Sequence, residues 1–171
     1  MTGSEAKEVV ALEMTGEHHH EDDDSHAGSP IKLAMEAKEP TLVFPSEPTK
    51  RHVYFLSNLD QNIAVPMRTV YFFNGQEDKK HDDPVSVIRE SLAKLLVHFY
   101  PLAGRLILSA DYKLQVDCQE QGALFVEAVA DHFIAELGEL SRPAPFMRQL
   151  VYDVPDAKNI LEVPPLIVQV K

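Results

Sequence analysis

The chain has 171 residues, of which 44% are hydrophobic and 25% are charged, a balance that is ordinary for one soluble globular domain. Its formal net charge is −11, but residues 1–28 hold eight acidic side chains against one basic side chain, which leaves only −4 for the rest. A mildly acidic body of this kind excludes nucleic acid as a partner, because affinity for nucleic acid depends on neutralising phosphates with Lys and Arg.

The sequence also excludes several cellular settings. No apolar run approaches the roughly 20 residues of a membrane-spanning helix, so we expect no membrane span. The acidic N-terminus has neither the basic flank of a secretory signal nor the arginines of a transit peptide, which predicts a cytoplasmic protein. Cys118 is the single cysteine and cannot form an internal disulfide.

Residues 1–28 are expected to form an acidic, disordered tail, followed by an incomplete folded domain over residues 29–171. The tail has little apolar periodicity, and residues 17–24 are a charge run. Histidine and aspartate at 18–24 are competent metal ligands, but adjacent ligands on a mobile tail lack surrounding groups that would hold them. We therefore predict no metal site.

The first elements of the domain are expected to be strands. Large apolar residues at 31, 33 and 35 alternate with Lys32, Ala34 and Glu36, which is the period of a half-buried strand. Prolines at 40, 45 and 48 exclude a helix over the next stretch. Aromatic and β-branched residues then predict strands at His52–Leu56 and Met67–Phe73, joined by a polar loop over 57–62.

The clearest helix follows a charged surface loop at 77–83. Asp83 is a good N-cap, Pro84 suits the first helical position, and Pro101 stops the helix. Apolar residues recur at spacings of three and four and mark one face of it: Val85, Ile88, Leu92, Leu95, Leu96 and Phe99.

A β-hairpin is expected next, with arms at 105–109 and 113–118. The inward residues of its second arm include Cys118, which is therefore interpreted as a small buried hydrophobe rather than a reactive thiol. Ala123–Val129 predicts a further strand, and Asp131 is expected to cap a short helix over His132–Leu137 that Gly138 breaks.

The last stretch, Leu166–Val170, is almost wholly apolar and predicts a central strand. Strands and helices in this order predict an α/β or α+β layered fold. Because natural termini are usually polar, a chain that stops inside such a strand is expected to be a fragment.

Catalytic constellations are sparse in the sequence. We find no glycine-rich phosphate loop, no nucleophile elbow and no paired cysteine motif. The pattern His-x-x-x-Asp occurs only in the tail, at His18, His19 and His20, where a general base would not be held in place. We interpret these matches as accidents of a low-complexity segment.

One segment carries a family resemblance. LAKLLVHFYPLAGRL at Leu92–Leu106 resembles the helix-and-turn signature of the BAHD acyltransferases of plants. Four further stretches are similar to the family in the same order: VFPSEPT at 43–49, YFLSNLDQN at 54–62, LQVDCQEQGALFVEA at 114–128 and PPLIVQV at 164–170. Together they extend over most of residues 31–171.

The resemblance implies a two-domain fold like that of chloramphenicol acetyltransferase, of which this chain supplies much of the first domain. It implies transfer of an acyl group from acyl-CoA, as co-substrate and without a bound cofactor, to an alcohol or amine, with a histidine as general base. That histidine belongs to a His-x-x-x-Asp motif beyond the last strand, so we expect no catalytic residue in this chain and no activity of the chain alone. The family's later Asp-Phe-Gly-Trp-Gly signature is absent too, since the chain has no tryptophan. A monomer is expected for the full-length protein.

The resemblance selects three residues on the acceptor side. In the family, the loop that matches Ser57, Asn58 and Asp60 lies beside the solvent channel, which makes these residues candidates for substrate binding. The alternative is that Ser57 and Asp60 form only turn and cap hydrogen bonds. Arg105 is expected to hold the hairpin through a carboxylate or a carbonyl.

Substrate and alternative functions remain open at this point. The stretch YFLSNLDQNIAVPMRTVYFF is similar to enzymes that move hydroxycinnamoyl groups, feruloyl in particular, onto ω-hydroxy fatty acids or fatty alcohols for suberin and cutin. Spermidine or a phenolic acceptor is the alternative within the family. Outside it, the chain would be a non-catalytic homologue that binds a protein partner, or a module whose acidic tail recruits a basic partner.

Overall fold

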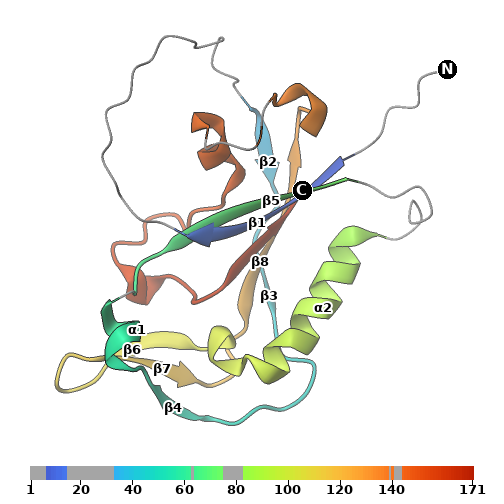
Figure 1. Cartoon of the computed structure of the whole chain (residues 1–171). Coiled ribbons are helices and arrows are strands. Elements are labelled where there is room, and N and C mark those ends of the chain that lie inside the picture. The colour runs from blue at the N-terminus through green and yellow to red at the C-terminus, as the bar shows by residue number, and fades with distance from the viewer. Residues whose placement is uncertain (1–6, 15–32, 63, 75–82, 139, 141–143) are drawn as a thin grey trace.

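The computed structural model describes residues 7–14, 33–62, 64–74, 83–138, 140 and 144–171. They form a six-stranded sheet and a three-stranded sheet with helices around them, so the mixed α/β class is confirmed (Figure 1). The strands are β1 Lys7–Met14, β2 Met35–Ala37, β3 Thr41–Val43, β4 His52–Phe55, β5 Met67–Asn74, β6 Arg105–Leu108, β7 Leu114–Cys118, β8 Ala123–Ala130 and β9 Ile167–Val170. The α-helices are α1 Asn58–Asn62 and α2 Pro84–His98, and the 3₁₀ turns are η2 Tyr100–Ala103, η3 Ile134–Glu136, η4 Pro145–Leu150 and η5 Ile160–Glu162.

The large sheet is built around β8. Its strand order is β2-β8-β9-β1-β5, and β3 also pairs with β8. β8 and β9 are parallel, with Leu124 opposite Ile167 and Glu127 opposite Val170, whereas the other pairs are antiparallel. β9 therefore lies inside the sheet, as its apolar sequence predicted.

One face of this sheet is covered by α2. The helix begins as predicted, with the Asp83 carboxylate accepting hydrogen bonds from the backbone N of Val85 at 3.2 Å and of Ser86 at 3.3 Å. Its apolar stripe packs on alternate residues of the strands. The buried residues of this cluster are Val43, Leu92, Leu96, Ala103, Ala123, Phe125, Val168 and Val170.

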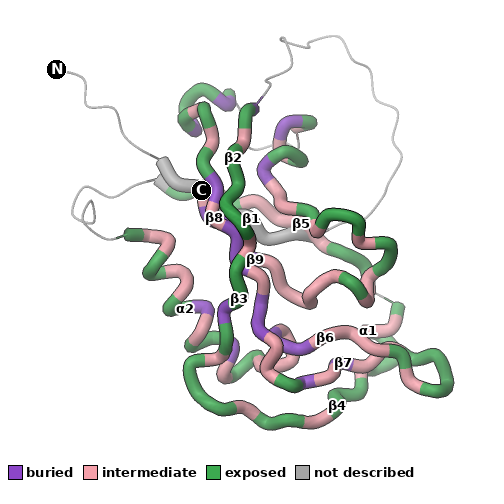
Figure 2. The backbone as a smooth tube through the Cα atoms, turned by 180° about the vertical axis from the view of Figure 1, so that it is seen from behind, coloured by how far each residue is buried: buried purple, intermediate pink, exposed green. Residues whose placement is uncertain are grey.

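The opposite face is covered by the chain between β8 and β9. Leu137, Phe146 and Leu150 of that segment form a second buried cluster with Leu33. Figure 2 shows that the buried backbone runs along β8 and β9, between the two coverings. Alternation along β9 turns Gln169 away from α2, and its side chain is buried with only 3% exposed.

The three-stranded sheet has the order β4-β7-β6, which confirms the predicted hairpin. Gly104 stands where η2 meets β6. A Cβ atom there would lie 2.6 Å from the carbonyl oxygen of Asp117 and 2.7 Å from a methyl of Val116. The turn in the PLAGRL motif therefore needs glycine because β7 passes so close, not because of an unusual φ angle.

The segment predicted to be an acidic tail contains one strand. Lys7–Met14 forms β1, which pairs with β5 from Lys7 opposite Asn74 to Met14 opposite Met67, and also with β9. Val10, Leu12 and Met14 alternate with Ala11 and Glu13, and that strand period was set aside in favour of the nearby charge run. Residues 1–6 and 15–28, including the histidines at 18–20, lie outside the described residues, so the division at residue 28 stays a prediction.

Other boundaries also differ from expectation. The strand expected from Ile31 begins at Met35, and Ile31 itself lies outside the described residues, as does most of the loop at 77–83. The helix expected over 132–137 is only the 3₁₀ turn η3. Asp131 does not cap it, because its Oδ1 accepts hydrogen bonds from the backbone N of Ala34 and from the ring of His132 instead.

Arg89 fastens α2 to the sheet. Its guanidinium donates to Glu127 Oε1 at 2.9 Å and to Thr41 Oγ1 at 2.9 Å, and lies 4.3 Å from the centroid of the Phe125 ring. Glu127 also accepts from the exposed Lys38 at 2.7 Å. A cation over a buried ring is stabilised more than an exposed ion pair.

Replacing Arg89 with methionine (R89M) is therefore expected to lower the free energy of unfolding by about 1–2 kcal/mol. The matched control is K38M, which removes the other partner of Glu127 and is expected to cost less. Urea denaturation of both variants measures the difference. Equal losses would show that the contacts with Thr41 and Phe125 contribute nothing.

Candidate functional site

The three acceptor-side candidates lie together at the start of α1. Asn58 and Asp60 lie within α1 and Ser57 directly precedes it, where the sequence predicted a polar loop, because Ser57 and Asp60 form a capping box. The backbone N and hydroxyl of Ser57 donate to Oδ2 of Asp60 at 2.9 and 2.7 Å, and the backbone N of Asp60 donates to Ser57 Oγ at 3.3 Å. These hydrogen bonds lower the pKa of Asp60, so its carboxylate is held in the charged form.

The candidates therefore differ in what they offer a ligand. The cap hydrogen bonds that the alternative interpretation expects are present between Ser57 and Asp60, and a role of either residue in substrate binding stays a prediction. Asn58 is exposed, and within the part of the chain that the structure describes its side-chain amide has no hydrogen-bond partner. Asn58 is the candidate whose side chain is available to another molecule.

Gln61 positions this helix, a role that sequence reasoning missed. Its amide Nε2 donates to the Leu114 carbonyl at 2.7 Å, and its Oε1 accepts from the Leu114 backbone N at 2.8 Å. Through these two bonds the Gln61 side chain pairs with the backbone of β7 as a neighbouring strand would. No sequence signal could have found them, since residues 61 and 114 meet only in the folded sheet.

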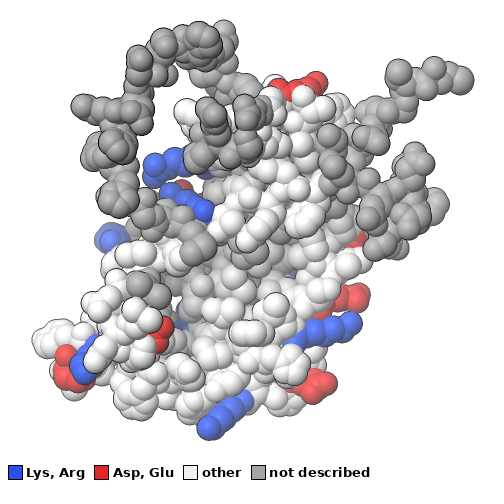
Figure 3. All heavy atoms as spheres, in the orientation of Figure 1, with Lys and Arg blue, Asp and Glu red and all other residues white. Residues whose placement is uncertain are grey.

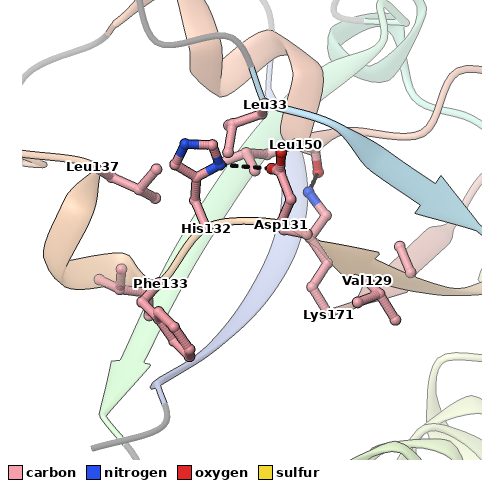
Figure 4. A pocket seen from close by; sticks show the side chains of 11 residues that line it. Leu33, Val129, Asp131, His132, Phe133, Leu137, Leu150 and Lys171 are labelled. Carbon is pink, nitrogen blue, oxygen red and sulfur yellow. Dashed lines mark hydrogen bonds and ion pairs between the residues drawn. The ribbon is translucent and has the colours of Figure 1, made fainter. Parts of the chain in front are cut away.

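A second candidate site is a cavity at the ends of β8 and β9. Its volume is about 220 Å³, and its walls are mainly apolar, with Leu33, Leu137 and Leu150 on one side (Figure 4). The polar residues on it are Asp131, His132 and Lys171. Burial lowers the pKa of Lys171 to about 7, and its Nζ donates to the carbonyl of Leu150.

His132 and Asp131 form a pair on the rim of this cavity. The Nδ1 atom of His132 donates to Asp131 Oδ1 at 2.6 Å, the dashed bond in Figure 4. This hydrogen bond raises the pKa of His132 and lowers the pKa of Asp131. The sequence analysis assigned Asp131 to a cap and His132 to a helix, so it missed the pair.

Two predicted structural roles are confirmed. Arg105 donates to the carbonyls of Gly104 at 2.7 Å and Gly122 at 2.8 Å, so it ties β6 to the start of β8. Cys118 is 1% exposed, and burial raises the pKa of its thiol. A buried thiol with a raised pKa is a poor nucleophile, as its position on the hairpin predicted.

We also searched the residues that the structure describes for a metal site, a basic surface and a membrane-spanning helix. They contain no group of three or more His, Cys, Asp or Glu side chains that could hold a metal ion. On the face shown in Figure 3, Lys and Arg lie singly or beside acids rather than in a stripe. No helix within the described ranges is long and apolar enough to cross a bilayer.

Comparison with known proteins links this architecture to one enzyme family. The sequence profile of the Transferase family matches residues 33–171. The chain is 51% identical over 144 residues to omega-hydroxypalmitate O-feruloyl transferase of Arabidopsis thaliana, covering 84% of this chain and 31% of that protein. It is 43% identical to fatty alcohol:caffeoyl-CoA acyltransferase of the same plant, covering 82% and 33%.

The fold is similar to that of a solved enzyme of this kind. The crystal structure of vinorine synthase superposes with a TM-score of 0.55 at 26% sequence identity, over 80% of this chain and 34% of that one. The chain thus spans about a third of the length of the relatives that it matches. Both the fold and the sequence of the described domain therefore agree with about a third of each of these longer enzymes.

The His132–Asp131 pair should make folding stability depend on pH. Because the pKa of His132 is raised above its ordinary 6.5, the stability that His132 contributes to the folded state is fully present below pH 6.5. This stability is lost as the pH rises through the raised pKa. Asp131 affects stability at acidic pH. Because its pKa is lowered, the stability that it contributes is present above pH 3.8 and is lost as the pH falls through the lowered pKa.

Replacing Asp131 with asparagine (D131N) is accordingly expected to lower the titration midpoint of His132, followed by NMR of the imidazole signals. E136Q is the control, because Glu136 contributes least to the raised pKa and its Oε2 accepts from the backbone N of Phe133. The same midpoint in the wild type and in D131N would refute the pairing.

Proposed function

The chain belongs to the Transferase family of BAHD acyltransferases, and from that premise we propose that its full-length protein transfers an acyl group from acyl-CoA to an alcohol. Identity of 51% to a feruloyl transferase is the observation that carries the proposal. Alcohol is favoured over amine because the relatives named for their acceptors are O-feruloyl, fatty alcohol and benzyl alcohol transferases.

The substrate class follows from the same relatives. The two plant enzymes at 51% and 43% identity are named for feruloyl and caffeoyl groups and for hydroxypalmitate and fatty alcohol acceptors. We therefore propose a hydroxycinnamoyl donor, with feruloyl-CoA as the first choice, and an ω-hydroxy fatty acid or fatty alcohol as acceptor. A long aliphatic acceptor would bring a large apolar surface to be buried.

The reaction requires a general base, an attacking hydroxyl and a thiolate leaving group. The base removes the proton of the acceptor hydroxyl, the oxygen attacks the thioester carbonyl, and the tetrahedral intermediate collapses to an ester and CoA. We propose that the base is the histidine of a His-x-x-x-Asp motif beyond Lys171, so that this chain supplies no catalytic residue. Its contribution is then the scaffold and the acceptor side at α1.

The first test is to read the transcript through the codon for Lys171 and to assay its complete product. We expect the reading frame to continue into His-x-x-x-Asp, and the complete protein to form an ester from feruloyl-CoA and 16-hydroxypalmitate. The 171-residue chain should form none, and spermidine should be a poor acceptor. A stop codon directly after Lys171 with an inactive chain would overturn the enzymatic proposal and favour a protein-binding homologue.

The second test concerns the acceptor side. In the complete enzyme, N58A is expected to raise KM for the acceptor about three- to tenfold, the cost of one hydrogen bond, and to leave KM for acyl-CoA unchanged. N62A is the matched control, because Asn62 lies on the same helix and its side-chain amide donates to the Asn58 carbonyl. Equal kinetics of N58A and the wild type would remove Asn58 from the substrate site.

A further inference from the structure

The cavity at the ends of β8 and β9 has the size of a ligand site. An engineered protein cavity of about 150 Å³ is large enough to bind benzene. The cavity here is about 220 Å³, so a single aromatic ring with a small substituent fits it. Its walls include Leu33, Val129, Ile134, Leu137 and Leu150, which suit an apolar body.

Lys171 brings an amine that can carry a positive charge to this apolar space. Val168 and Val170 pack on the α2 side of β9, so alternation directs Lys171 to the opposite side, where it lines the cavity. Burial without a counter-charge disfavours an ammonium, which is why its pKa falls to about 7. Among the described residues, no carboxylate lies within ion-pair distance of its Nζ atom.

The hydrogen bonds of Lys171 leave room for an anion. An ammonium has three donors, and one of them is used by the Leu150 carbonyl. A carboxylate could accept the others in charge-assisted hydrogen bonds and would supply the missing counter-charge.

The rest of the rim limits the ligand to one negative charge. Asp131 lines the same cavity, and although His132 and the backbone N of Ala34 engage its carboxylate, it would repel a dianion such as phosphate. The mainly apolar walls also offer too few donors for phosphate oxygens.

We propose that this cavity binds a small apolar monocarboxylate, such as an aromatic acid, with the carboxylate on Lys171 and the body among Leu137, Leu150 and Ile134. The site is separate from the proposed acceptor side at α1, and binding there does not require acyl transfer. The ligand site can therefore be refuted while the proposed acyl transfer holds, and acyl transfer can be refuted while the ligand site holds.

Benzoate and benzamide are matched probes, because they share a ring and differ in charge. Titration calorimetry with the 171-residue chain is expected to show benzoate binding about tenfold more tightly than benzamide. K171M should abolish that preference while keeping the apolar stem, and K113M, at an exposed lysine of the hairpin turn, should retain it.

The position of binding is tested separately by NMR of the wild-type chain, which does not depend on the folding of a variant. Benzoate should shift the methyl signals of Leu137 and Leu150 and leave those of Leu108, on the hairpin, unchanged. Equal binding of the two probes, no binding of either, a preference that survives in K171M, or shifts away from the cavity would each overturn the proposal.

Discussion

Parallel pairing of β8 with β9 is the constraint on which the rest of the domain depends. Two parallel strands cannot be joined by a tight turn, so residues 131–166 must cross a face of the sheet before β9 can pair. That crossing supplies Leu137, Phe146 and Leu150, which bury the face that α2 does not cover. Most of β8 and β9 is therefore covered on both faces, which explains why these strands are so apolar.

The same constraint creates the cavity. The chain turns away from the sheet directly after Ala130, and η3 and η4 close over the strand ends without filling the space between them. Lys171 then projects into this space from β9, since its neighbour Val170 already faces α2. Strand alternation thus directs a titratable side chain into the apolar surroundings that the crossing segment supplies.

Polar side chains at the other candidate site serve mainly to hold the structure. Ser57 and Asp60 cap α1, and Gln61 fastens it to β7, so the helix presents Asn58 from a fixed position. A substrate-binding residue needs such support, because loose side chains lose conformational entropy on binding. Capping and substrate binding can therefore coexist in one short motif, with different residues in each role.

Local patterns were sufficient where one element decides its own conformation. The α2 helix followed from its cap, its proline and its apolar spacing, and the hairpin and β9 followed from their strand patterns. The resemblance of residues 92–106 to an acyltransferase signature also needed no structure. Local sequence patterns missed two elements. The strand at Lys7–Met14 lies beside a charge run that indicated a disordered tail, and the residues of the α1 capping box are also typical of a polar loop.

The sequence by itself therefore determined the α/β class, the main elements and the family, because caps, periodicities and motifs act over a few residues. Only the tertiary structure decided the partners of β8, the hydrogen bond of Asp131 with Ala34, the anchoring of α1 by Gln61 and the desolvation of Lys171. Each of these joins residues with segments far apart in the chain or depends on how the chain packs around them. Their distance, burial and electrostatic coupling exist only after the sheet has formed.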